Sequence, residues 1–162
     1  MLAWRDALEG AGIELSVWRI HRKIGMSGGL FTQALLRETG RELDRAMIEG
    51  LQRSHAEAYR ARADQVRPLP GTRELLARLS RLEVPWAIAT SGRLETAGPV
   101  LAMLDLPPSV PVVTRDLVAH AKPDPDLFVE AARRLGADVS RSVVVGDSVW
   151  DLLAARRANA LG

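Results

Sequence analysis

The sequence contains no cysteine, which excludes disulfide bonds and metal sites built from thiolates. It also lacks any apolar run near the roughly 18 residues needed to cross a membrane. The first residues, MLAWRDALEGAG, mix charged and apolar side chains in an amphipathic helical pattern that differs from a signal peptide. We therefore expect a cytoplasmic protein without a membrane partner.

The sequence also has little net charge and no aromatic platform. The formal net charge is +2, and basic residues are interleaved with acids instead of forming a stripe. This pattern predicts no nucleic-acid partner. Of the 22 basic residues, only Lys23 and Lys122 are lysine. In a chain so rich in arginine, a lysine indicates a position that needs a compact ammonium group instead of a planar guanidinium.

The first part of the chain is predicted to be helical throughout. Apolar residues recur there at helical spacing, and the Gly-rich segment Gly25 to Gly29 interrupts the pattern. The longest expected helix begins at Glu42, runs to about Gln65, and carries Leu43, Met47, Leu51, His55 and Tyr59 on one face. With 162 residues, the chain has room for a small core and a subdomain. We expect an α-helical subdomain over residues 1–66.

The character of the sequence changes after Pro68, Pro70 and Gly71. From there, helical patterns alternate with three short apolar segments, WAIAT (86–90), VPVVT (110–114) and SVVVG (142–146). Strands that alternate with helices of this length are typical of βαβ units and a parallel sheet covered on both faces. The prediction for residues 67–162 is therefore an α/β core.

Polar residues follow the predicted strands, where ligands of open parallel sheets bind. Thr90 and Ser91 end the first strand, Lys122 lies in the loop after the second, and Asp147 and Asp151 follow the third. Two carboxylates suit Mg²⁺, which is often shared with a phosphate. Hydroxyl and ammonium groups donate hydrogen bonds to phosphoryl oxygens. Together these groups predict a phosphoryl-transfer site, where catalysis is mainly positioning and charge stabilisation.

Each of these residues also has a simpler interpretation. Thr90 and Ser91 suit a turn and helix cap, Lys122 can be solvated, and Asp151 can stabilise a helix N-terminus. Asp124 before Pro125 is interpreted as a helix cap, so the DPD segment is not taken as a catalytic pair. It is the ordered occurrence of the whole set at successive strand ends that favours the site.

These motifs resemble those of a known superfamily. Thr90 in WAIATSG, Lys122 in AKPDPDLF and the segment VVVGDSVWD are similar, in order and spacing, to the second, third and fourth motifs of the haloacid dehalogenase superfamily. The likeness is greatest to phosphatases and mutases of the phosphoglycolate phosphatase and β-phosphoglucomutase kind. It implies an incomplete Rossmann-like core (67–162) with an α-helical cap (1–66), Mg²⁺ as cofactor and a small phosphorylated metabolite as substrate.

The resemblance also assigns roles to residues of this chain. It implies that Thr90 and Lys122 are catalytic, the first donating to a phosphoryl oxygen and the second pairing with phosphate. Asp147 is implied as a direct Mg²⁺ ligand, and Asp151 as a direct or water-mediated one. Substrate contacts are expected from five residues of the core and the cap, which are Ser91, Arg93, Arg22, Gly25 and Ser27.

One family motif has no counterpart here. In the superfamily, a strand ending in Asp-x-Asp-Gly-Thr supplies the nucleophilic aspartate, and these 162 residues contain no such segment. By resemblance, that strand lies between the segments 86–90 and 142–146, so its absence exposes backbone groups and apolar edges. The last residues, ANALG, stand where the family begins another strand. We therefore expect a truncated chain that hydrolyses no phosphate monoester by itself.

Two alternatives stay open beside the hydrolase interpretation. One is a non-catalytic remnant or interaction module that keeps the motifs without the activity. The other, ranked lower, is a receiver-like doubly wound binding domain, which explains neither the helical first part nor the acids Asp147 and Asp151. The identity of the substrate, the choice between phosphatase and phosphomutase, and the oligomeric state are left open by the sequence.

Overall fold

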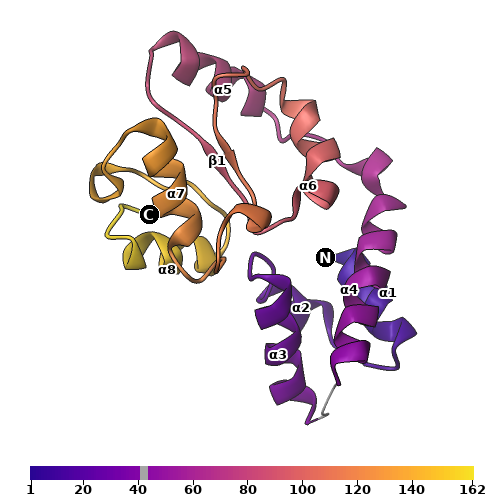
Figure 1. The fold of residues 1–162 in the computed structure, drawn as a ribbon. Helices are drawn as coiled ribbons and strands as arrows, with labels where there is room; N and C mark the ends of the chain where they lie inside the picture. The colour runs from indigo at the N-terminus through magenta and orange to yellow at the C-terminus, as the bar shows by residue number, and fades with distance from the viewer. Residues whose placement is uncertain (41–43) are drawn as a thin grey trace. The chain divides into compact units, whose positions relative to one another are not determined.

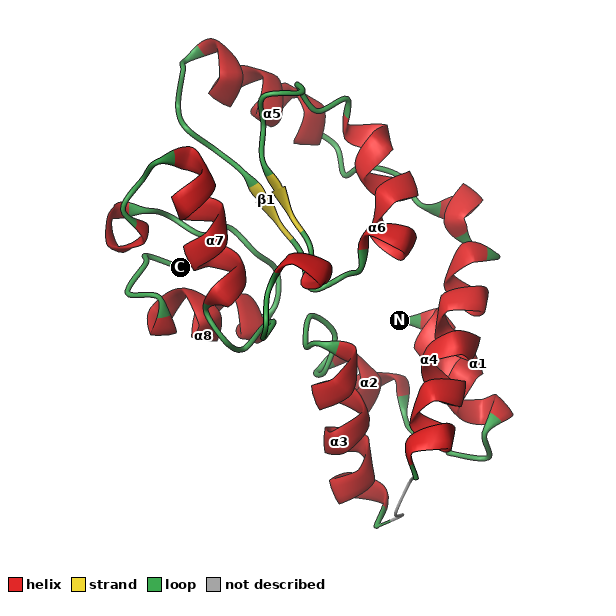
Figure 2. Cartoon of the chain, in the orientation of Figure 1, coloured by secondary structure: helices red, strands yellow, loops and turns green. Residues whose placement is uncertain are grey.

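The computed structural model describes residues 1–40 and 44–162 (Figure 1). The chain divides into two compact units, Met1–Gln65 and Val66–Gly162. Figure 2 shows that helices predominate and that the strands are short. Among the described residues, none of the helices is long and apolar enough to cross a membrane.

Unit 1 is built from helices. They are α1 (Leu2–Gly10), α2 (Val17–His21), α3 (Gly28–Thr39), α4 (Arg45–Arg60) and the 3₁₀ turn η1 (Ala63–Gln65). Asp44 caps α4, because its carboxylate accepts a hydrogen bond from the Met47 N–H at 2.8 Å. The predicted start of this helix at Glu42, with Leu43, lies outside the described residues.

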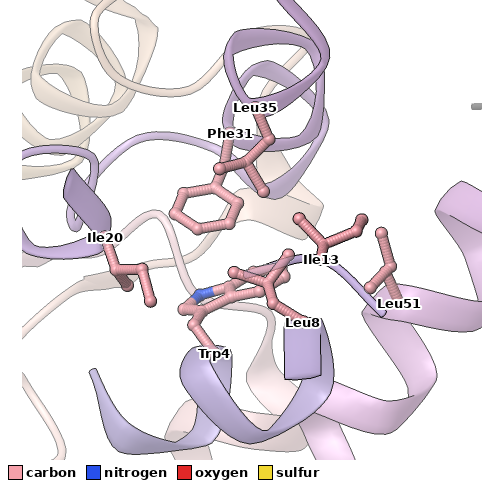
Figure 3. Packing of buried hydrophobic residues seen from close by; sticks show 7 residues of the cluster. All are labelled: Trp4, Leu8, Ile13, Ile20, Phe31, Leu35 and Leu51. Carbon is pink, nitrogen blue, oxygen red and sulfur yellow. The ribbon is translucent and has the colours of Figure 1, made fainter. Parts of the chain in front are cut away.

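The core of unit 1 is organised around the indole of Trp4 (Figure 3). The Trp4 ring stacks on Phe31 from α3, with centroids 4.0 Å apart, and on His55 from α4, with centroids 3.9 Å apart. Stacked aromatic pairs stabilise by about 0.5–1.5 kcal/mol beyond the area they bury. Trp4 therefore ties α1 to two other helices, within a cluster formed by Trp4, Leu8, Ile13, Ile20, Phe31, Leu35 and Leu51.

Two ion pairs connect distant parts of unit 1. Arg62 donates to the carboxylate of Asp6, which joins the end of α4 to α1. Lys23 donates to Glu38 Oε1 at 2.5 Å, and the residue is only 8% exposed. The segment after α2 is thereby held to the last turn of α3.

Unit 2 contains a small parallel sheet. Strands β1 (Ile88–Ala89) and β2 (Val112–Val113) pair with Ile88 opposite Val112. The helices of the unit are α5 (Thr72–Arg81), α6 (Leu94–Leu101), α7 (Asp126–Leu135) and α8 (Val149–Arg157), with 3₁₀ turns η2 (Ala102–Leu104), η3 (Arg115–Leu117) and η4 (Val139–Arg141). The first two predicted strands are present, although each is shorter than expected.

The third predicted strand, 142–146, is reduced to a single parallel bridge between Val143 and Leu161. Val144 N–H donates to the Leu161 carbonyl at 2.7 Å, and Leu161 N–H donates to Ser142 at 3.0 Å. The side chains still alternate as in a strand, since Val144 packs inward while Val143 and Val145 are 67% and 89% exposed. Pairing with so short a segment explains why the expected strand does not extend further.

Helix α7 joins the two core clusters of unit 2, and it lies beside α8 in Figure 1. Leu127 packs with Val113 and Ala121 near the sheet, whereas Phe128 packs with the buried alanines of α8. Ala89, at the end of β1, packs against both clusters. The carboxyl end of β1 therefore lies where sheet, α7 and α8 meet.

Burial gives the helical unit a pH-dependent stability. It lowers the pKa of His55 from 6.5 to about 4, with a smaller effect of the Met1 amino group. Because the unfolded chain takes up this proton near pH 6.5 and the folded chain only near pH 4, stability falls as the pH drops between these values. The loss at pH 4 is on the order of 3 kcal/mol.

This dependence is measurable by urea unfolding followed through tryptophan fluorescence between pH 7 and pH 4. His55→Phe keeps an aromatic ring against Trp4 and should flatten the profile over that range. Tyr59→Phe changes the neighbouring ring, leaves His55 in place, and should keep the slope of the unmodified chain. An equal slope in His55→Phe and the unmodified chain would contradict the assignment.

Candidate functional site

Two of the predicted site residues form a buried ion pair. Lys122 Nζ donates to Asp151 Oδ1 at 2.6 Å, and the two side chains are 10% and 9% exposed. Lys122 follows Ala121, which is buried beside Val113 of β2, and Asp151 lies in the first turn of α8. The packing of unit 2 thus joins motifs that are 29 residues apart in the sequence.

Asp151 also caps the helix that carries it. The Ser148 hydroxyl accepts a hydrogen bond from the Asp151 N–H at 3.3 Å, and Asp151 Oδ2 accepts one from the Ser148 N–H at 3.1 Å. This reciprocal arrangement is a capping box. One carboxylate oxygen thus meets the ammonium and the other the backbone. The role of metal ligand for Asp151 stays a prediction, while its role as a helix cap is observed.

Gly146 makes room for this carboxylate. A Cβ at this position would lie 2.5 Å from Asp151 Cγ and 2.6 Å from Oδ2, which no side chain tolerates. The glycine of VVVGD therefore lets the backbone pass directly against Asp151. The next residue, Asp147, is exposed. Asp147, the predicted metal ligand, therefore directly follows Gly146, the residue whose backbone lies against Asp151.

Thr90 stands at the carboxyl end of β1. Its N–H donates to the Val113 carbonyl at 2.9 Å, and its hydroxyl accepts from the Gly92 N–H at 3.1 Å. This bond agrees with the turn interpretation, whereas the N-cap position of α6 (Leu94–Leu101) is Arg93, so Thr90 and Ser91 do not cap the helix. The turn is compatible with a phosphate role because a hydroxyl that accepts one bond can still donate its hydrogen. Ala89 and Ala121, the residues before Thr90 and Lys122, belong to the same packed cluster. The backbone before Thr90 and the backbone before Lys122 thus pack in one part of the core.

A carboxylate that the sequence did not single out supports the loop after β1. Asp116 accepts from the Leu94 N–H at 2.8 Å and from Arg93 Nη1 at 2.9 Å. The backbone hydrogen bond from Leu94 is the main cause that lowers the pKa of Asp116, and Arg93 adds to it. The only sequence signal was an acid three residues after Val113. A substrate contact by Arg93 stays a prediction, and the structure places its guanidinium on Asp116.

Ser91 directly follows Thr90 in unit 2, and the three other predicted substrate contacts belong to unit 1. The Arg22 guanidinium lies 5.8 Å from the centre of the Trp18 ring. Gly25 has a φ of 94°, a conformation that favours glycine, and the Ser27 carbonyl accepts the Phe31 N–H at 2.9 Å. The structure thus shows how Arg22, Gly25 and Ser27 are held, and their contact with substrate stays a prediction.

Oxygen donors for a cation are present in unit 2, but they are not clustered. Within residues 1–40 and 44–162, no three acidic or histidine side chains gather in a group that could hold a metal ion. Mg²⁺ commonly uses one or two carboxylates and fills its other positions with water and substrate phosphate. The exposed carboxylate of Asp147 fits such a site as a single protein ligand.

Loss of one partner of the buried pair should destabilise unit 2. Asp151→Asn leaves the Lys122 ammonium buried without its counter-charge, which costs about 3–5 kcal/mol. Lys122→Met removes the charge with similar side-chain length, so the double variant should lose less than the sum of the two single ones. Urea unfolding followed by circular dichroism measures the three free energies.

Asp105→Asn serves as the matched control, because Asp105 is 72% exposed in its 3.5 Å ion pair with Arg73. Exposed pairs of this kind contribute about 0–1 kcal/mol. Strictly additive losses in the double variant would show that Lys122 and Asp151 do not interact.

Comparison with known proteins places these features in a family. A family model described as haloacid dehalogenase-like hydrolase matches residues 2–159. The chain is 38% identical to a phosphoglycolate phosphatase of Agrobacterium fabrum, over 76% of this chain and 53% of the relative. It is 31% identical to the fructose-1-phosphate phosphatase YqaB of Escherichia coli, over 96% of this chain and 81% of the relative.

Solved structures agree with this result. A hydrolase from Pseudomonas syringae is 48% identical with a TM-score of 0.94, and the match covers 98% of this chain and 73% of that one. A β-phosphoglucomutase from Clostridium difficile, 17% identical with a TM-score of 0.78, shares the fold over 98% of this chain and 73% of its own. The predicted α/β class is thereby confirmed.

The chain spans about half the length of the phosphoglycolate phosphatases that it matches. The family match nevertheless extends over nearly all of its 162 residues and includes each strand-end motif described above. The resemblance seen in the motifs is therefore confirmed, and the chain belongs to the haloacid dehalogenase-like hydrolase family.

Proposed function

We propose that this chain carries the phosphate-binding and Mg²⁺-binding part of a phosphatase that acts on a small phosphorylated metabolite. The observation that carries this proposal is the buried ion pair of Lys122 and Asp151 at 2.6 Å, which joins the loop after β2 to the first turn of α8 in a hydrolase core. An ammonium group has three N–H donors, so the contact with Asp151 leaves two for phosphoryl oxygens. Asp151 aims the ammonium, and the phosphate completes its shell of acceptors.

Thr90 supplies a second hydrogen-bond donor in this proposal. Its hydroxyl accepts from Gly92, which fixes the oxygen and leaves the hydrogen for a phosphoryl oxygen. The Ser91 backbone N–H stands beside it at the end of β1. The neutral donors of Thr90 and Ser91 and the Lys122 ammonium then together stabilise the negative charge of the phosphoryl group, as transfer reactions of this class require.

Asp147 would hold Mg²⁺, and Asp151 would contribute directly or through water. The ion, when bound, neutralises charge that develops on the phosphoryl oxygens. Asp147 suits this role because it is exposed and follows Gly146 directly. Lys122 lies against Asp151 and not on a separate surface, so the cation and the ammonium would approach the same anion from neighbouring positions.

The substrate class follows from the names of the relatives. They include phosphatases named for phosphoglycolate and for fructose 1-phosphate, which are small phosphate monoesters. We propose the same class for this chain, with Arg93 and the unit 1 residues Arg22, Gly25 and Ser27 as substrate contacts. A cytoplasmic location remains part of the same proposal.

The 162 residues bind the phosphoryl group in this proposal without attacking it. They contain no Asp-x-Asp-Gly-Thr segment, the source of the nucleophile in the family resemblance. Lys122, Thr90 and Asp147 can stabilise charge, but none of them is a carboxylate placed for in-line attack. The alternative of a non-catalytic binding module therefore applies to these residues taken alone.

Binding of inorganic phosphate should depend on Mg²⁺ through Asp147. Calorimetric titration of the chain with phosphate, with and without Mg²⁺, should show tighter binding with the cation. Asp147→Asn removes the ligand charge and should abolish this difference, because a neutral amide is a poorer ligand for a hard cation. Asp105→Asn, the same exchange at an exposed loop position, should keep it. A Mg²⁺ effect that persists unchanged in Asp147→Asn rules out the ligand assignment.

The chain should not hydrolyse p-nitrophenyl phosphate in the presence of Mg²⁺, because it lacks the attacking carboxylate. Release of p-nitrophenolate, followed by absorbance, measures this directly. Turnover that disappears in Thr90→Ala or Lys122→Ala would refute the claim that these residues bind without attacking. Turnover that persists in both variants would come from a contaminating enzyme, and purification to constant specific activity separates the two cases.

A further inference from the structure

The loop that carries Lys122 contacts α8 at two separate points. One is the ion pair with Asp151 in the first turn of the helix. The other is Arg157 in the last turn, where Nη1 donates to the Pro123 carbonyl at 3.0 Å and lies 3.5 Å from Asp124 Oδ1. Asp151 and Arg157 are six positions apart on the helix, which corresponds to about 9 Å along the axis. The loop is therefore held along the length of α8.

The second contact acts on the main chain next to the ammonium-bearing residue. Pro123 directly follows Lys122, so a bond to its carbonyl restrains the backbone from which the lysine side chain extends. The lysine side chain has four rotatable bonds, and its ammonium stays in place only if both ends are fixed. Asp151 holds the ammonium end, and Arg157 holds the backbone end.

The other side of the loop is anchored to α7. The His120 N–H donates to Asp126 Oδ2 at 3.0 Å, in the first turn of that helix. Leu127, the next residue, is fully buried, so this exposed bond lies directly beside the packed core. The side toward α8 has no comparable apolar anchor among the described residues of the loop, where Asp124 is intermediate in exposure. Arg157 supplies the polar link on that side.

We propose that Arg157 is a positioning residue for Lys122. Through the Pro123 carbonyl and the Asp124 carboxylate it sets the distance of the loop from α8, so that one ammonium reaches both Asp151 and a bound phosphoryl group. This inference rests on the proposed function only in its last part, the contact with phosphate. The contact to a main-chain carbonyl distinguishes Arg157 from an ordinary exposed ion pair, which contributes little.

The scarcity of lysine permits a direct test. With ¹⁵N-lysine labelling, only Lys23 and Lys122 contribute side-chain signals. Both ammonium groups are buried on carboxylates, which slows their proton exchange enough for detection at low temperature. Lys122→Met assigns its signal by removal, and Lys23, in unit 1, serves as an internal reference.

Arg157→Gln should shift the Lys122 ammonium signal and leave the Lys23 signal in place. It should also weaken binding of inorganic phosphate with Mg²⁺ by about tenfold, the effect of one charge-assisted hydrogen bond. Arg156→Gln is the matched control, because Arg156 is the adjacent exposed arginine of the same helix. It should change neither the signal nor the affinity.

The possible results separate the two claims. An unchanged Lys122 signal and affinity in Arg157→Gln would overturn the positioning role. If the Lys122 signal of the unmodified chain does not change when phosphate is added, the proposed function is overturned. A shift of this signal in Arg157→Gln without ligand would still support the positioning role. If Arg157→Gln unfolds unit 2, Asp124→Asn decides the question. It leaves the sequence of α8 unchanged and removes one of the two contacts of Arg157 with the loop. A shifted Lys122 signal supports the positioning role, and an unshifted one refutes the part of it assigned to Asp124.

Discussion

The arrangement of unit 2 depends on one buried ion pair, Lys122 with Asp151. Removing two charges from water is costly, and their attraction compensates only when the geometry is good and the remaining polar atoms are satisfied. The structure meets these conditions with a 2.6 Å contact, a capping box at Ser148 and a glycine at position 146 that leaves space for the carboxylate. Two motifs that are 29 residues apart in the sequence therefore serve a single contact.

The two lysines of the chain use the same chemistry in different units. Lys23 pairs with Glu38 and Lys122 with Asp151, and both lysines are 8% exposed. The exposed ion pairs, such as Arg45 with Glu49 and Arg93 with Asp116, use arginine. A compact ammonium fits a confined space that a planar guanidinium does not. Since Lys23 has no assigned chemistry, burial of a lysine on a carboxylate does not by itself define a site; the proposal for Lys122 also rests on its place in the loop after β2, against the first turn of α8.

Much of this could be predicted from the sequence because it depends on local patterns. Thr90, Lys122 and Asp151 follow short apolar segments, and parallel strands bring such ends together. The partner of Lys122 could not be predicted, because Asp151 is 29 residues away and meets it only through the packing of α7 on α8. Asp116 and Arg157 were missed for the same reason: their contacts, to residues 22 and 34 positions away, leave no local periodicity. The third strand was predicted too long because apolar content indicates burial, whereas strand length depends on the neighbour that pairs with it.

The surrounding structure therefore holds the parts of the candidate site with unequal firmness. Lys122 and Asp151 are fixed by a helix with two buried alanines, a capping box and the close approach of the Gly146 backbone. Asp147 follows a segment with a single bridge to Leu161, in which Val143 and Val145 are largely exposed. Local stability follows the number of buried contacts and backbone hydrogen bonds. The ammonium that would meet an anion is thus preorganised, whereas the carboxylate that would meet a cation depends on the segment that pairs with residues 142–146. Anion binding should accordingly tolerate changes at this segment that cation binding does not.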